Sequence, residues 1–108
     1  MAELNTPQTP PLRVELGRDD GVPVIQMAGE LDLSTADTAR LAMAPALEGS
    51  PPRVILDLGG LAFMDSSGIA LLVSLTQAET VVEIRKPSRS IRRLLEVTGL
   101  TDTFRIVD

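Results

Sequence analysis

Apolar and charged residues alternate where the periodic part of the chain begins. Leucine and valine occupy every second position over residues 12–16, with Arg13 and Glu15 between them. A period of two is typical of a strand with one buried face. A turn at residues 17–21 separates this stretch from a second apolar stretch at residues 22–28, so the pair predicts an antiparallel hairpin.

Helices and strands are predicted to alternate after the hairpin. A helix is expected after Ser34 or Thr35, with a kink or an early end at Pro45, because proline removes a helical hydrogen bond and costs about 3 kcal/mol. The other predicted elements are strands at residues 53–58, 81–85 and 104–107, a helix at residues 66–77, and a helix that begins at Ser88 and ends before Gly99. The order β-β-α-β-α-β-α-β indicates an α/β fold in which the strands after the hairpin are parallel neighbours.

The stretch at residues 63–72 reads Phe-Met-Asp-Ser-Ser-Gly-Ile-Ala-Leu-Leu and follows the predicted strand at residues 53–58. It places one carboxylate and two hydroxyls where a helix begins. Asp and Ser are favoured at such a position because their oxygens accept bonds from unpaired amides, and the same amides attract anions such as phosphate. The stretch is therefore a plain helix cap or a cap used as a phosphate switch. These residues alone favour the plain cap, because such caps are common.

A second polar loop, at residues 29–35, follows the second strand of the hairpin. Functional loops in parallel sheets tend to lie beyond the carboxyl ends of the strands. The loops at residues 29–35 and 60–67 both fall there, and the paired glycines at residues 59–60 suit a tight exit from the preceding strand.

The composition limits the available chemistry. With 108 residues and 44% hydrophobic content, the chain can build one domain with one core, which must be aliphatic because only two residues are aromatic. The absence of cysteine and histidine excludes disulfides, thiolate metal sites and a Ser-His-Asp triad, and argues against an enzyme. The net charge of −5 disfavours nucleic acid as a partner.

The N-terminal region and the hydropathy profile bear on location. Residues 1–11 carry three prolines among polar residues, which predicts a flexible tail ahead of a single domain at residues 12–108. No apolar stretch reaches the length of a membrane span, and no signal peptide is visible. We therefore expect a cytoplasmic location.

Two other kinds of site are weaker interpretations of the sequence. Asp32, Asp57 and Asp65 lie near predicted strand ends and could suggest a magnesium or phosphoaspartate site, but aspartates that cap helices and finish turns are more common. A basic run over residues 85–93 could contact phosphates. A solvated helix face is the favoured reading of that run, because the chain is acidic and the run has no interleaved aromatic residues.

Three segments together resemble a known family. They are Gly-Glu-Leu-Asp at residues 29–32 followed by Thr35-Ala36, the Phe-Met-Asp-Ser-Ser-Gly segment at residues 63–68, and the stretch at residues 92–100. They resemble the STAS-domain anti-sigma factor antagonists of bacteria over residues 12–108. The resemblance implies a mixed sheet of four or five strands with helices packed mainly on one side.

The resemblance also implies a regulatory function without catalysis or a cofactor. In this family, an anti-sigma factor that is also a serine kinase phosphorylates the serine directly after the motif aspartate, and a metal-dependent serine phosphatase reverses the modification. The unphosphorylated antagonist binds the anti-sigma factor and frees the sigma factor. The free antagonist is expected to be a monomer.

Carried over to this chain, Ser66 is the expected phosphoacceptor and Ser67 a supporting hydroxyl or a secondary site. Asp32 and Asp65 are expected to frame Ser66 in partner docking or kinase recognition, with Gly68 in the same binding segment. The loop that carries Asp32 is expected to be exposed.

One segment departs from the family pattern, and two other functions stay open. Residues 74–80 reach the next strand with neither glycine nor proline, which predicts a shortened helix or a tight, strained connection. The alternative function is a soluble STAS accessory subunit of a membrane transport complex, but the acceptor serine favours the antagonist. A nucleotide-binding or weakly hydrolytic domain has little support, because histidine, cysteine and a phosphate-binding P-loop are all absent.

Overall fold

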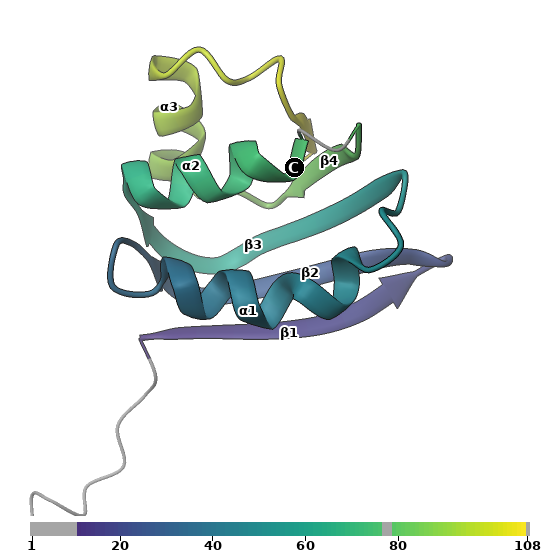
Figure 1. The fold of residues 1–108 in the computed structure, drawn as a ribbon. Helices are drawn as coiled ribbons and strands as arrows, with labels where there is room; N and C mark the ends of the chain where they lie inside the picture. Colours follow the sequence, from purple (N-terminus) through teal and green to yellow (C-terminus); the bar gives the residue numbers. More distant parts are fainter. Residues whose placement is uncertain (1–10, 77–78, 108) are drawn as a thin grey trace, which may run out of the picture.

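The computed structural model describes residues 11–76 and 79–107 of the chain. The predicted tail before residue 11 and the predicted helix end at residue 77 lie outside the described residues. The elements, in order, are β1 (Leu12–Asp19), β2 (Val22–Leu31), α1 (Ala36–Leu47), β3 (Arg53–Met64), α2 (Ser66–Leu75), β4 (Val81–Arg85), α3 (Arg89–Val97) and β5 (Arg105–Val107) (Figure 1). The predicted order of strands and helices is confirmed.

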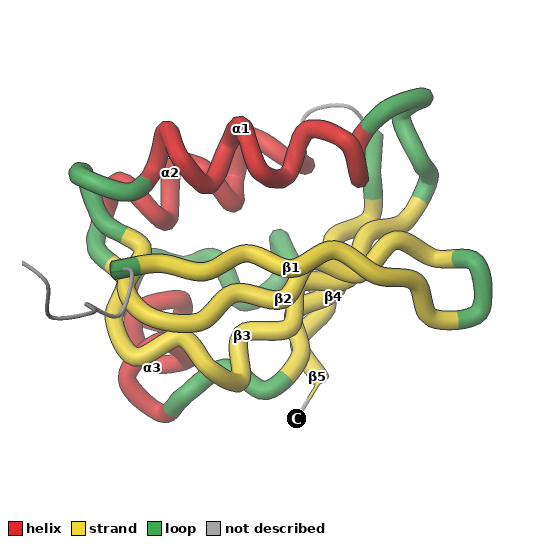
Figure 2. Tube along the Cα trace, turned by 90° about the horizontal axis from the view of Figure 1, so that it is seen from below, coloured by secondary structure: helices red, strands yellow, loops and turns green. Residues whose placement is uncertain are grey.

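The strands form one mixed sheet in the order β1-β2-β3-β4-β5. Strands β1 and β2 are the predicted antiparallel hairpin, and every later pair is parallel. From β2 onward the chain always steps in the same direction, so right-handed crossovers bring all three helices to one face. Figure 2 shows α1 and α2 side by side over that face, while α3 lies farther along the twisted sheet.

The core is a single aliphatic cluster between the sheet and the helices. Alternate residues of β3, namely Val54, Leu56 and Leu58, point into it, and the two buried residues of α3 join the same cluster. Among its members are Ile25, Met27, Leu56, Leu58, Leu71, Leu72, Ile84, Ile91 and Leu95. The core therefore connects all three helices with the central strands.

Strand β3 is longer than predicted. It runs from Arg53 to Met64 and does not leave the sheet at residues 59–60. Its register against β2 shifts twice, and each shift places one extra residue in β3. Gly60 lies opposite Ala28, and a Cβ atom on Gly60 would come within 2.9 Å of the Ala28 side chain. The glycines thus allow the strand to bulge and continue.

Helix α1 does not end early at Pro45, which was one of the two outcomes predicted there. The helix continues to Leu47, so Pro45 lies in its last turn. Pro45 is exposed, and water can therefore hydrate the carbonyl that loses its helical partner.

The connection after α2, predicted to be tight unless the helix is shortened, includes residues 77–78, which lie outside the described residues. The helix ends at Leu75, and Glu79 adopts a φ of 62°. This left-handed conformation normally favours glycine. Glu79 therefore adopts a backbone conformation that glycine usually adopts, in a segment that contains no glycine.

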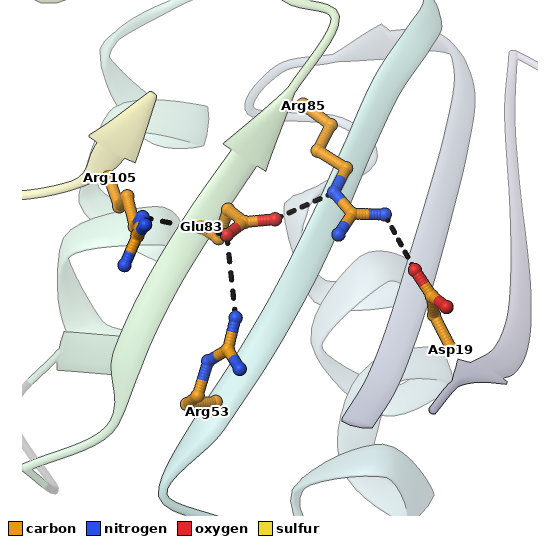
Figure 3. A network of polar contacts seen from close by, with 5 residues as sticks. All are labelled: Asp19, Arg53, Glu83, Arg85 and Arg105. Carbon is orange, nitrogen blue, oxygen red and sulfur yellow. Dashed lines mark hydrogen bonds and ion pairs between the residues drawn. The ribbon is translucent and has the colours of Figure 1, made fainter. Parts of the chain in front are cut away.

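A polar network lies on the sheet face opposite the helices (Figure 3). Glu83 alternates with the core residues Val82 and Ile84, so its side chain points to that opposite face, yet it is only 7% exposed. Its carboxylate pairs with arginines from three strands: Arg85 at 2.6 Å, Arg53 at 3.5 Å and Arg105 at 3.8 Å. Arg85 also pairs with Asp19 at 2.9 Å, so the network connects β1, β3, β4 and β5.

Candidate partner-binding site

Parallel pairing of β2 and β3 brings the two candidate loops together. The last residues of these strands, Leu31 and Met64, are register partners, and Asp32 and Asp65 follow them directly. The amide of Asp65 donates to the carbonyl of Leu31 at 3.2 Å. Figures 1 and 2 both show the β2–α1 loop and the start of α2 at the same end of the molecule. The two predicted acidic residues therefore share one edge of the sheet.

Asp65 caps α2. Its backbone is extended, with φ −111° and ψ −167°, and its Oδ1 accepts hydrogen bonds from the amides of Ser67 at 2.8 Å and Gly68 at 3.3 Å. Ser66 is the first residue of the helix, and it is exposed. The cap and the candidate phosphoacceptor are therefore different residues, and the two interpretations of this motif are compatible.

Ser67 and Gly68 lie deeper than Ser66. Ser67 is half-buried and Gly68 is buried. A Cβ atom on Gly68 would collide with the Met64 side chain and lie 3.0 Å from the side chain and the carbonyl oxygen of Leu31. Gly68 therefore lets the first turn of α2 pass close to the ends of β2 and β3, and it offers no side chain to a partner.

Asp32 closes the second loop on itself. Its Oδ1 accepts hydrogen bonds from the hydroxyl of Ser34 at 2.7 Å and from the amides of Ser34 and Thr35 at 2.9 and 3.2 Å. The hydroxyl of Ser34 is the largest cause that lowers the pKa of Asp32 below its ordinary value, and the amides of Ser34 and Thr35 act in the same direction. Asp32 is therefore a half-buried carboxylate that orders its own loop.

Thr35 has a structural role that the sequence analysis missed. It occupies the cap position of α1, but its side chain makes no capping bond to the helix. Its buried hydroxyl donates to the carbonyl of Glu30 at 2.9 Å and accepts from the amide of Asp32 at 3.0 Å. The amide of Ala36 donates instead to the backbone carbonyl of Asp32 at 2.9 Å. Thr35 thereby fixes the end of β2 to the start of α1.

Two apolar side chains near this edge are exposed. Leu33, inside the loop closed by Asp32, is 81% exposed, and Phe63, near the end of β3, is 47% exposed. The sequence analysis gave Leu33 no role. The only available signal was its position between Asp32 and Ser34 in a loop otherwise suited to polar residues.

The three aspartates do not form a metal site. Asp57 lies within β3, and its Oδ1 accepts from the amide of Gly59 at 2.9 Å. Within residues 11–76 and 79–107, no group of three or more acidic side chains is arranged to hold a metal ion. In the same part of the chain, every helix is too short or too polar to cross a membrane.

Known proteins are similar to this chain over nearly its whole described length. A family model described as "Mlab, STAS domain" matches residues 14–108. The anti-sigma F factor antagonist of Paenibacillus polymyxa is 29% identical over 102 residues, which cover 90% of this chain and 87% of that protein. The anti-sigma-B factor antagonist of Staphylococcus aureus is 28% identical over 99 residues, which cover 88% and 92%.

A solved structure is similar to this chain in both fold and sequence. The crystal structure of an anti-sigma factor antagonist from Mycobacterium paratuberculosis has a TM-score of 0.80 at 28% identity, with 88% of this chain and 84% of that chain covered. The sheet order, the capped motif at the start of α2 and a family match over nearly the whole domain agree. The chain therefore belongs to the STAS domain family.

Proposed function

We propose that this protein is an anti-sigma factor antagonist and that Ser66 is the phosphoacceptor of its switch. The observation that carries the proposal is the position of Ser66: exposed, first in α2, and next to the capping carboxylate of Asp65. The similarity to relatives named as anti-sigma factor antagonists supports the partner class. The protein is then a regulator that works by binding, in the cytoplasm and as a monomer when free.

The unphosphorylated form binds the anti-sigma factor and releases the sigma factor. The anti-sigma factor is itself the serine kinase, and a metal-dependent serine phosphatase restores the unphosphorylated form. Phosphorylation adds about −1.5 to −2 charges. Asp65 already accepts from the amides of Ser67 and Gly68, so a phosphate on Ser66 adds charge beside the cap without replacing it. The modification therefore changes the surface seen by the partner and leaves the fold intact.

The alternative function is an accessory subunit of a membrane transport complex. Such a subunit needs surfaces for its complex but no acceptor hydroxyl at this edge. The exposed Ser66 beside Asp65 therefore favours the phosphorylatable antagonist.

Site-specific phosphorylation tests the proposal. The chain would be incubated with the candidate anti-sigma factor kinase, ATP and magnesium, then measured by intact mass and by fragment mapping. We expect one phosphate on the wild type, located at Ser66, and none on Ser66→Ala. Ser67→Ala is the matched control and should still gain one phosphate. A wild-type chain that stays unmodified, or that carries its phosphate on another residue, would refute the assignment of Ser66.

A further inference from the structure

Leu33 is the most exposed large apolar side chain among the described residues, at 81%. Most leucines of this chain lie in the core or pack partly against it. An apolar side chain is stabilised only where it leaves water, so Leu33 contributes little to folding. Its apolar surface becomes useful when another molecule covers it.

The backbone around Leu33 is held in one shape. Asp32 accepts hydrogen bonds from both the amide and the hydroxyl of Ser34, which lie on the far side of Leu33. Thr35 closes the loop again through its bond from the amide of Asp32 and its bond to Glu30. A side chain presented on an ordered loop loses less conformational entropy on binding than one on a mobile loop.

The loop also places Leu33 at the same end of the sheet as the proposed switch. Leu33 lies two residues beyond Leu31, and Ser66 lies two residues beyond Met64, the register partner of Leu31. Phe63, which is also exposed, is the register partner of Glu30 at the same end of the two strands. Leu33 and Phe63 are therefore exposed apolar side chains at the end of the sheet where Ser66 lies.

We propose that Leu33 is a preformed apolar anchor that enters an apolar pocket on the anti-sigma factor, and that Asp32 acts as a positioning residue for it. This inference rests on the proposed function and adds the chemistry of the contact. It also explains the sign of the switch, because a phosphate introduced at an apolar interface must lose its hydration and therefore weakens binding. An interface built only on charge would not require Leu33.

Calorimetric titration against the candidate anti-sigma factor tests the anchor. We expect Leu33→Ala to weaken binding about tenfold or more, as for a central apolar contact, and Leu33→Met to keep most of the affinity because it keeps the apolar volume. Leu41→Ala is the matched control: Leu41 is 76% exposed on α1, and its replacement should change the affinity less than twofold. Thermal unfolding of all three variants should match the wild type.

The role of Asp32 is tested in the same assay. Asp32→Asn keeps an acceptor oxygen for Ser34 and Thr35 but loses the charge, whereas Asp32→Ala loses both. A positioning role predicts that Asp32→Asn binds more tightly than Asp32→Ala. Equal losses for these two variants would contradict positioning and indicate a direct charge contact.

The outcomes separate this inference from the function on which it rests. If the wild type binds and Leu33→Ala binds equally well, or if Leu41→Ala is weakened as much as Leu33→Ala, the anchor is refuted and the antagonist function stands. If the wild type does not bind the anti-sigma factor, the proposed function fails and the anchor fails with it.

Discussion

Asp65 caps α2, whereas Ser66 is the proposed phosphoacceptor. Asp65 bonds the amides of Ser67 and Gly68, whereas Ser66 is exposed to solvent. The sequence predicted where this site lies but not which residue caps the helix, because aspartate and serine both cap helices well. The assignment depends on which residue keeps an extended backbone before the helix begins, and that is a property of the folded chain.

Replacing Asp65, which caps the helix, should therefore lower stability, whereas replacing Ser66, the proposed phosphoacceptor, should not. We expect Asp65→Ala to lower the free energy of unfolding by about 1 kcal/mol. Ser66→Ala should change it by less than about 0.5 kcal/mol, as for a surface site. Urea unfolding followed by circular dichroism measures both, with Asp65→Asn as a control that retains a capping oxygen. A larger loss for Ser66→Ala than for Asp65→Ala would reverse the assignment.

The hydrogen bonds to Asp32 make the stability of the fold depend on pH. Because the hydroxyl of Ser34 and the nearby amides lower the pKa of Asp32 in the folded chain, the ionised carboxylate stabilises the fold. This stabilisation is complete above the pKa of an unfolded aspartate, about 3.9, and is lost as the pH falls through the lower folded pKa.

Carboxyl ¹³C shifts followed over a pH titration test this coupling. The midpoint for Asp32 should lie below the ordinary aspartate value, and Ser34→Ala should raise it toward that value. Thr38→Ala serves as a control. Thr38 is exposed and is not among the groups that shift the pKa of Asp32, so this change should leave the midpoint unchanged. A midpoint at or above the ordinary value would contradict the hydrogen-bonded loop.

At the scale of elements, strand β3 decides where the site forms. Its apolar run at residues 53–58 predicted a strand that leaves the sheet at the two glycines. The strand instead bulges twice and continues to Met64, opposite Leu31. A period-two pattern cannot reveal this continuation, because each extra residue reverses which face the following side chains occupy. The bulges bring Asp65 beside the end of β2, so they are needed for the site.

Glu83 should stabilise the part of the sheet formed by β3, β4 and β5. Its side chain is nearly buried and pairs with arginines from β3, β4 and β5, so removing it leaves three cations without their shared carboxylate. We expect Glu83→Ala to lower the free energy of unfolding by about 2 kcal/mol, a value moderated by the partial exposure of the arginines. Asp19→Ala, at the exposed end of the same network, should change stability little.

Chemical denaturation of the two variants provides the comparison. Equal stability of the Glu83→Ala variant and the wild type would mean that solvent replaces the network without cost. A loss for Asp19→Ala as large as that for Glu83→Ala would contradict the difference in burial.

At the scale of the whole molecule, the order of elements and the parallel topology followed from the sequence. Strand–helix–strand units allow few arrangements once crossovers are right-handed, and the apolar periodicity marked each unit. The register was not accessible in this way, because it depends on bulges and on close contacts such as that between Gly60 and Ala28. The edge that holds Ser66, Asp32 and Leu33 was therefore predicted as a region, whereas the capping bonds and the exposed leucine required the structure.

The phosphorylation switch is tested most directly by the affinity for the anti-sigma factor before and after modification of Ser66. Calorimetric titration of the unphosphorylated chain and of the chain phosphorylated at Ser66, with matched circular dichroism spectra, gives both affinities. We predict that phosphorylation weakens binding at least tenfold, or about 1.4 kcal/mol, while the fold is unchanged. Equal affinity of the two forms, or tighter binding of the phosphorylated form, would contradict the switch.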